Sequence, residues 1–189
     1  MTTINKECEI ISRGGILLHK TDTIWGLACD ALNLNSIHKI YRIKKRPSNK
    51  PLIILVNSLE MLQKYVYNIP KNITDKIKKF DEPSTIIYSN PKNLPQILIH
   101  NNSIAIRITK NKKCKEIINT IKNPIVSTSA NISGEPFPKK FSEINSLIKK
   151  SVDYIIKEKN EDNKSDDKVK PSLLYRINKK QELEHIDRW

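Results

Sequence analysis

The 189-residue sequence predicts an α/β fold with a twisted, mixed β-sheet flanked by helices. Short apolar runs typical of buried strands alternate with segments whose apolar residues recur three and four positions apart, the spacing of a helix face. Hydrophobic residues make up 38% and charged residues 29% of the sequence, the balance of a globular protein with a core. We therefore expect one domain over residues 1–189, with no membrane-spanning segment.

The predicted strands are short, apolar and bounded by polar or turn-forming residues. They cover residues 16–19, 51–56, 85–88, 103–108, 124–126, 152–156, 171–177 and 182–189. The helices that alternate with them cover residues 36–45, 57–66, 72–80, 112–121 and 142–150. Asn35 is the expected cap of the first helix, and Asn57 with Glu60 resembles a capping box at the second. Residues 157–170 carry five basic and five acidic residues, which predicts a mobile charged loop.

The three cysteines and four histidines show no spacing that suits a disulfide framework or a metal site. Such a chain fits a reducing cytoplasm, and its N-terminus lacks the apolar core of a signal peptide. No GxxxxGK[ST], GxGxxG or GxSxG occurs, which argues against a P-loop NTPase, a Rossmann dinucleotide site and a serine hydrolase. The formal net charge of +14 attracts polyanions, among which RNA is the obvious candidate.

Two stretches of small polar residues follow predicted strands, where α/β proteins commonly bind ligands. Residues 127–138 read STSANISGEPFP, and residues 19–31 read HKTDTIWGLACDA. The serines and Asn131 of the first stretch, and the threonines around Asp22 in the second, can contact a polar ligand. The first stretch can equally be a solvated loop, and the threonines can merely cap a turn.

Residues 39–50 contain six lysines or arginines and no acidic residue. Such a run is normally a solvated basic helix face. Lys44, however, continues the apolar spacing that begins at Ile37, so it should turn inward. Arg46 precedes Pro47, which favours an extended backbone beyond the helix. Two cations leaving one helix end in this way can form a phosphate clamp.

Arg107 lies within the predicted strand 103–108, in which Ser103 and Arg107 share one face. An unpaired charge within an apolar strand is costly. Arg107 therefore either pairs with a carboxylate of the fold or binds an anionic ligand.

Together these motifs resemble those of the YrdC-like family, the L-threonylcarbamoyl-AMP synthases, in their short single-domain form. The motifs are KTDTIWGLACDA, KKRPSNKPL, SIAIR and STSANISGEPFP, and the resemblance runs from about Gly14 to Arg188. It implies a YrdC-like twisted mixed sheet with a concave, positively charged cavity. It also implies that L-threonine, bicarbonate or CO2, and ATP give threonylcarbamoyl-AMP and pyrophosphate, for threonylcarbamoyladenosine modification of tRNA.

The resemblance assigns site residues by position. The threonine-binding residues would be Thr23, Arg107, Ser129 and Ser172. The ATP-binding residues would be Lys44, Arg46, Lys50, Ser103, Asn131, Lys139 and Arg188. Lys44 and Arg46 would be catalytic, because they would stabilise charge on the phosphates of ATP, which Mg²⁺ accompanies. The carbamate would attack the α-phosphate in line, so no covalent nucleophile is required.

The sequence also departs from the family pattern. Lys20 replaces the usual proline, Ala28 the last glycine of GLG, and Asp81-Glu82 part of a Pro-Gly-Pro. Leu55 stands where the family usually has a histidine that contacts threonine or the carbamate. The KxR and SAN elements are intact, so we expect an active but diverged enzyme.

Two other functions remain open. One is a non-catalytic RNA-binding protein of the same fold, which would hold tRNA or ribosomal RNA on its basic concave surface. The other is an accessory domain for carbamoyl transfer. For the enzyme, the expected partners are ATP, L-threonine, bicarbonate, a downstream threonylcarbamoyl-transferase complex, and tRNA or double-stranded RNA.

Overall fold

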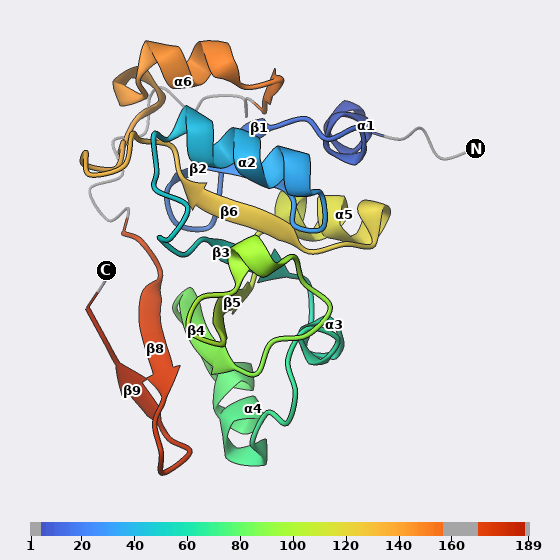
Figure 1. Ribbon diagram of the computed structural model, residues 1–189, viewed down its shortest axis with the longest axis vertical. Coiled ribbons are helices and arrows are strands. Elements are labelled where there is room, and N and C mark those ends of the chain that lie inside the picture. The colour runs from blue at the N-terminus through green and yellow to red at the C-terminus, as the bar shows by residue number, and fades with distance from the viewer. Residues whose placement is uncertain (1–4, 157–169, 188–189) are drawn as a thin grey trace.

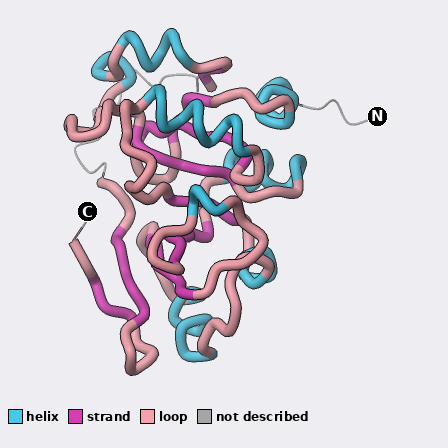
Figure 2. The backbone as a smooth tube through the Cα atoms, in the orientation of Figure 1, coloured by secondary structure: helices cyan, strands magenta, loops and turns pink. Residues whose placement is uncertain are grey.

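A computed structural model describes residues 5–156 and 170–187, and within them one nine-stranded mixed sheet is surrounded by helices (Figures 1 and 2). The order of the strands across the sheet is β7-β1-β2-β6-β3-β5-β4-β8-β9. The strands are β1 (Leu17–Lys20), β2 (Trp25–Asp30), β3 (Ile53–Val56), β4 (Ser84–Ser89), β5 (Ser103–Ile108), β6 (Ile125–Ser129), β7 (Tyr154–Ile155), β8 (Leu173–Ile177) and β9 (Leu183–His185). The predicted α/β fold with a mixed sheet is confirmed.

Parallel and antiparallel pairs alternate irregularly across the sheet. The pairs β1–β7, β3–β5 and β4–β8 are parallel, and the remaining neighbours are antiparallel. In the pair β3–β5, Leu55 lies opposite Arg107. Paired residues point to the same face of a sheet, so Leu55 lies directly beside Arg107.

The helices lie around this sheet, and α2 passes in front of β2 and β6 in Figure 1. They are α1 (Lys6–Ser12), α2 (Leu34–Ile43), α3 (Leu59–Gln63), α4 (Lys71–Lys78), α5 (Lys112–Ile121) and α6 (Ser146–Ser151), with the short 3₁₀ helices η1 (Gln96–Leu98) and η2 (Phe141–Glu143). The apolar face of α2 is buried through Ile37 and Ile40, as its helical spacing predicts. None of the helices in the described part of the chain is both long and apolar enough to span a bilayer.

Most predicted elements are found, with shifted ends. The strand 103–108 and the helix 112–121 have the predicted bounds. The first predicted helix begins earlier, because the side chain of Asn33, not of Asn35, accepts the N–H of Ser36 at 3.0 Å. The predicted capping box at Asn57 is wrong, since Ser58 caps α3.

Three parts of the sequence prediction differ from the fold in kind. No prediction covers α1 or β2, and the predicted helix 142–150 is divided between η2 and α6. The run Trp25–Asp30 contains small residues with weak strand preference, and pairing with β1 on one side and β6 on the other makes it a strand. The expected mobile loop at 157–170 lies outside the described residues, except for its last residue.

Candidate active site

A cavity of about 330 Å³ lies where the β1–β2 turn, the segment after α2 and the segment after β6 meet. It gathers seven of the eleven predicted site residues. They are Thr23, Lys44, Arg46, Arg107, Ser129, Asn131 and Ser172. Three of these are cations, and Glu135 is the carboxylate in the lining. Segments that are far apart in the sequence thus converge on one cavity, whose lining carries three cations and one carboxylate.

The C-terminal end of α2 delivers two of the cations. The backbone N–H of Arg46 donates to Tyr41 O at 2.9 Å and that of Lys45 donates to Arg42 O at 3.0 Å. Lys45 adopts a left-handed backbone conformation with φ 47°. These features form a Schellman motif, in which a left-handed residue reverses the chain at a helix end. As a result Lys44 and Arg46 both line the cavity.

Lys44 turns inward, as the helical spacing predicts, and its side chain is buried. Its ammonium donates to Ser129 O at 2.5 Å, to Asn131 O at 2.7 Å and to Asn131 Oδ1 at 3.3 Å. Burial and the nearby charge of Arg46 lower the pKa of Lys44 to about 7, while the three oxygen acceptors favour the ammonium form. The backbone N–H of Ser133 also donates to Lys44 O at 2.8 Å. Lys44 therefore fastens the loop after β6 to the end of α2.

Arg46 is half-buried at the rim of the cavity and keeps an unused donor. One terminal nitrogen donates to Pro51 O at 2.8 Å, and the other lies 3.4 Å from the hydroxyl of Ser133. Its Nε is buried without a hydrogen-bond partner among the described residues. Burial lowers the pKa of Arg46. A guanidinium that is held by Pro51 O and also lines a cavity suits an anionic ligand.

Arg107 is 5% exposed, and the structure shows the first of the two alternatives that its sequence position leaves open, an ion pair with a carboxylate of the fold. It lines the cavity, and its Nη2 lies 3.1 Å from Asp22 Oδ1, which has no hydrogen-bond partner, so the contact is an ion pair without hydrogen-bond alignment. Its Nη1 lies 3.3 Å from the hydroxyl of Thr23, and its Nε has no partner among the described residues. Burial lowers the pKa of Arg107, and the charge of Asp22 opposes that shift.

The two threonines of the β1–β2 turn have different roles. The hydroxyl of Thr21 donates to Ile24 O at 2.8 Å and accepts the N–H groups of Thr23 and Ile24. Thr21 therefore caps the turn, as one alternative proposes. The hydroxyl of Thr23 contacts that of Thr21 at 2.8 Å and lines the cavity beside Arg107.

The loop after β6 is held in shape by its own polar groups. The amide of Asn131 donates to Glu135 O at 2.5 Å and to Ile132 O at 3.1 Å. Gly134, with φ 94°, supplies the left-handed residue of the turn and lines the cavity. Ser129 lies at the end of β6, and the hydroxyl of Ser172 contacts that of Thr85 at 2.8 Å. The stretch is thus a structured wall of the cavity.

Four predicted ATP-binding residues are not among those lining the cavity. The hydroxyl of Ser103 donates to His100 O at 2.7 Å at the start of β5. Lys50 and Lys139 are exposed in loops, where Lys50 O accepts the hydroxyl of Tyr41 at 3.0 Å. Arg188 lies outside the described residues. Their contacts with ATP stay predictions.

His19 is a buried residue of this region that the sequence prediction did not single out. It is 1% exposed on β1, its Nδ1 lies 3.9 Å from Cys114 Sγ, and its Nε2 has no partner among the described residues. Burial, and then the charge of Arg107, lower its pKa to about 4. The one sign of His19 in the sequence is that a histidine ends an apolar run, and nothing in the sequence indicates that it lies near Arg107.

Comparison with known proteins gives consistent matches along the chain. The Sua5/YciO/YrdC family model, described as "Telomere recombination", matches residues 9–173. A protein named threonylcarbamoyl-AMP synthase from Hydrogenovibrio crunogenus is 31% identical over 140 residues, which are 71% of this chain and 75% of that protein. A putative threonylcarbamoyl-AMP synthase from Methanocaldococcus jannaschii is 37% identical over 148 residues, or 77% and 69% of the two chains.

Solved structures agree with this fold. P. abyssi Sua5 complexed with L-threonine superimposes with a TM-score of 0.80 at 25% identity, covering 90% of this chain and 49% of that one. This chain therefore spans about half the length of that protein. E. coli YciO has a TM-score of 0.73 at 23% identity and is covered over 83% of its length, which supports the fold. The chain belongs to the Sua5/YciO/YrdC family.

Proposed function

We propose that this protein is a threonylcarbamoyl-AMP synthase, which converts L-threonine, bicarbonate or CO2, and ATP into threonylcarbamoyl-AMP and pyrophosphate. The observation that carries the proposal is the cavity that joins buried Arg107 to Thr23, Ser129 and Arg46. Relatives named for this activity match most of the chain, and a similar structure is a complex with L-threonine. These findings favour the enzyme over a non-catalytic RNA-binding protein.

Threonine would bind at the Arg107 side of the cavity. Asp22 already neutralises part of the charge of Arg107, and the guanidinium, which lines the cavity, would donate to the carboxylate of threonine. The hydroxyls of Thr23, Ser129 and Ser172 would bind the amino and hydroxyl groups of the amino acid. Because a buried arginine prefers a planar anion that takes two hydrogen bonds, a carboxylate is a better ligand here than a single oxygen.

ATP would bind at the Arg46 side, with Mg²⁺ as part of the nucleotide substrate. The amino group of threonine attacks CO2 to give the carbamate and releases a proton. A carbamate oxygen then attacks the α-phosphorus in line, and the bond to the β-phosphate breaks as pyrophosphate leaves. Arg46 and the charge of Lys44 would stabilise the growing negative charge, and Asn131 would orient the nucleotide. Lys50, Ser103, Lys139 and Arg188 complete the proposed ATP set.

The remaining partners follow from the product. Threonylcarbamoyl-AMP would pass to a threonylcarbamoyl-transferase complex, which modifies tRNA. We place the reaction in the cytoplasm, because Cys8, Cys29 and Cys114 are buried free thiols and suit a reducing compartment.

Pyrophosphate release tests the proposal directly. Release from ATP should require threonine and bicarbonate together, and omission of either should abolish it. Serine in place of threonine provides a specificity control, because it lacks one methyl group and should react more slowly. Release that is indifferent to threonine, or none in the complete mixture, would contradict the proposal.

A further inference from the structure

A separate pocket, of about 250 Å³, lies between the strands β4 and β5 and residues of α3, α4 and α5. We call it the rear pocket. Ile106 and Ile108 line it, whereas Arg107, which stands between them in β5, lines the active-site cavity. Successive residues of a strand point to opposite faces of the sheet. The rear pocket and the active-site cavity therefore lie on opposite sides of β5.

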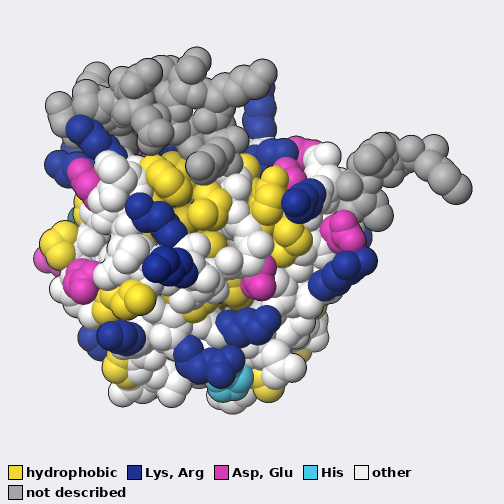
Figure 3. Space-filling model, turned by 90° about the horizontal axis from the view of Figure 1, so that it is seen from above, with side chains coloured by type: hydrophobic (Ala, Val, Ile, Leu, Met, Phe, Trp, Pro, Cys, Tyr) yellow, Lys and Arg dark blue, Asp and Glu magenta, His cyan; other side chains and the backbone are white. Residues whose placement is uncertain are grey.

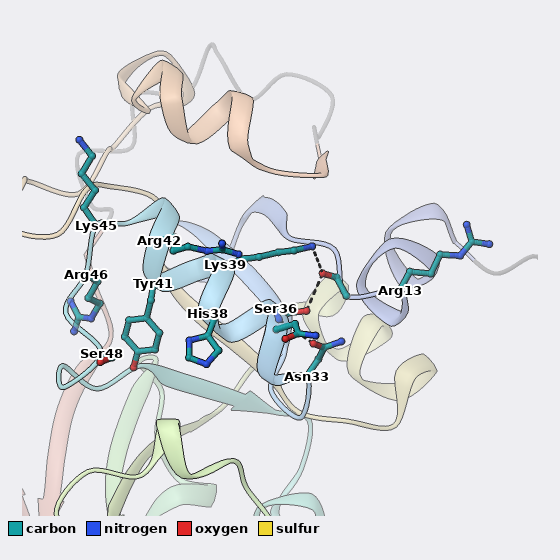
Figure 4. A pocket seen from close by; sticks show the side chains of 12 residues that line it. Arg13, Asn33, Ser36, His38, Lys39, Tyr41, Arg42, Lys45, Arg46 and Ser48 are labelled. Atoms are coloured by element: carbon teal, nitrogen blue, oxygen red, sulfur yellow. Dashed lines mark hydrogen bonds between the residues drawn. The ribbon is translucent and has the colours of Figure 1, made fainter.

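The wall of the rear pocket is mainly apolar. Its apolar residues include Leu59, Ile77, Phe80, Ile86, Ile106 and Ile108. A larger depression on the outer side of α2, of about 920 Å³, is instead lined mainly by polar and charged side chains (Figure 4). None of the large hydrophobic side chains that are exposed in the described part of the chain lines the rear pocket. The pocket thus has the apolar wall of a small-molecule site and lacks the exposed apolar anchors of a protein interface.

The charged groups of the rear pocket favour an anionic ligand. They are Lys78, Lys110, Lys115 and Glu82. The ammonium of Lys110 donates to Phe80 O at 2.5 Å and to Asp81 O at 3.2 Å, which leaves one of its three protons for a ligand. The ammonium of Lys115 has no hydrogen-bond or ion-pair partner among the described residues. Two lysines therefore have donors to offer beside an apolar wall.

A cation alone does not mark a site in this protein. Lys and Arg side chains outnumber Asp and Glu over the described surface that Figure 3 shows. The rear pocket differs from that surface by its apolar wall and by the hydroxyl of Tyr88. Tyr88 is 2% exposed, lines the pocket and makes no hydrogen bond through its hydroxyl within the described residues. Burial raises its pKa, so the hydroxyl keeps its proton and can donate to an oxygen of a ligand.

The segment after β5 connects the rear pocket to the ion pair of the active-site cavity. Lys110 lines the rear pocket, and its backbone N–H donates to Asp22 Oδ2 at 3.3 Å. The other carboxylate oxygen, Asp22 Oδ1, lies 3.1 Å from Arg107 Nη2. An anion bound beside Lys110 would add negative charge behind Arg107. That charge would weaken the attraction of Arg107 for a second anion on the other side of the strand.

We propose that the rear pocket binds a small carboxylate with an apolar ring or branched chain, and that its occupancy weakens threonine binding at Arg107. The apolar body lies against Ile86 and Ile106, and the carboxylate binds Lys110 and Lys115. Binding of the carboxylate is independent of the proposed function, whereas the effect on threonine rests on it. By linkage, threonine should weaken carboxylate binding by the same factor.

NMR spectra of protein labelled with ¹³C at the isoleucine δ1 methyl groups, titrated with 3-phenylpropionate, test the location of the site. Signals of the isoleucines that line the rear pocket should shift, and those of Ile24 and Ile53 in the active-site cavity should not. We expect a Kd on the order of 1 mM. The uncharged 3-phenylpropanamide should bind at least about tenfold more weakly, because it lacks the charge that the lysines attract.

Two lysines of α5 provide a matched pair of variants. Lys115→Met keeps the stem of the side chain and removes the ammonium, so it should weaken 3-phenylpropionate about fivefold and leave 3-phenylpropanamide unchanged. Lys112→Met makes the same change on the same helix at an exposed residue outside the pocket, and should alter affinity by less than about twofold. Leu59→Phe fills part of the pocket and should weaken both probes.

The effect on threonine is measured by calorimetric titration. Saturating 3-phenylpropionate should weaken threonine binding about fivefold in the wild-type protein. Unchanged threonine affinity would overturn the proposed coupling. Binding of 3-phenylpropionate in the rear pocket of a protein that neither binds threonine nor releases pyrophosphate would support the site and contradict only the synthase proposal.

Three results would overturn the site itself. Shifts at Ile24 and Ile53 in place of the rear-pocket isoleucines would put the carboxylate in the active-site cavity. Equal losses in Lys112→Met and Lys115→Met would show that net charge alone attracts the probe. Equal affinities for 3-phenylpropionate and 3-phenylpropanamide would show that the lysines do not select an anion.

Discussion

Replacement of Lys44 by methionine should loosen the loop after β6 and leave the fold in place. Methionine is about as long as the lysine stem but has no ammonium, so the buried space remains filled. The change removes the donor shared by Ser129 O, Asn131 O and Asn131 Oδ1. The backbone bond from Ser133 N to residue 44 is retained.

Two opposing contributions determine how far Lys44→Met changes the free energy of unfolding. A hydrogen bond from a charged donor contributes about 1.5–3 kcal/mol, so the two shorter bonds of Lys44 contribute about 3–6 kcal/mol. The fall of its pKa from 10.5 to about 7 corresponds to about 5 kcal/mol for burying the charge and holding it near Arg46. These terms nearly cancel, as is common when an apolar side chain replaces a buried charge. We expect the free energy of unfolding to fall by no more than about 2 kcal/mol.

The local effect should be larger and is measured by hydrogen exchange. Amides of residues 129–134 should exchange at least about tenfold faster in Lys44→Met, a change of about 1.4 kcal/mol in local opening. Affinities for threonine and ATP should both fall, because Ser129 and Asn131 lose their positions together. Lys45→Met, one residue away and exposed, is the control and should leave exchange and both affinities unchanged. Unchanged loop exchange in Lys44→Met, with ATP affinity alone reduced, would refute the positioning role and indicate direct contact with phosphates.

Three further predictions concern other positions. Arg107→Ala should weaken threonine binding by about 2–4 kcal/mol in a calorimetric titration, and unchanged affinity would limit Arg107 to its ion pair with Asp22. His19 has a pKa lowered from 6.5 to about 4, so below pH 6.5 the unfolded state binds a proton that the folded state does not. As the pH falls from 6.5 to 4, the free energy of unfolding, measured in urea, should therefore decrease by about 3 kcal/mol more in the wild-type protein than in His19→Leu. An equal decrease in the two proteins would contradict this prediction. Lys45→Gly should raise the free energy of unfolding by about 0.5–1 kcal/mol with normal pyrophosphate release, because glycine relieves the left-handed conformation, and a loss of stability would show that the conformation is not strained.

The sequence predicted best those helices and strands whose formation depends on residues close together in the chain. The run SIAIRI is apolar and β-branched, and the helix 112–121 has a regular apolar spacing, so β5 and α5 appear at their predicted bounds. The strand β2 was missed because its preference is weak and its two neighbours in the sheet, β1 and β6, supply its stability. Sequence periodicity carries no information on a partner that is distant in the chain.

The same limit applies to the site. Helical spacing predicted that Lys44 turns inward, but its hydrogen-bond partner Ser129 is 85 positions away along the chain. The alternatives for Arg107 could not be decided from alternation, because Asp22 reaches it from another turn of the fold, 85 residues earlier. The resemblance supplied Lys44 and Arg46 together as candidate residues. Only the structure shows that Lys44 holds the loop after β6, whereas Arg46 lies at the rim of the cavity.

The spacing of the two cations in KxR follows from the backbone at the end of α2. Lys44 closes the helix and faces the core, while Lys45, left-handed, reverses the chain. Figure 4 shows Lys45 and Arg46 pointing in opposite directions, so the reversal brings Arg46 back to the cavity. One intervening residue is what the Schellman motif requires, since none would leave Arg46 on the helix and two would carry it past the rim. The middle residue must therefore tolerate a positive φ. Lysine does so at a modest cost, whereas a β-branched residue at position 45 would strain the turn that positions both cations.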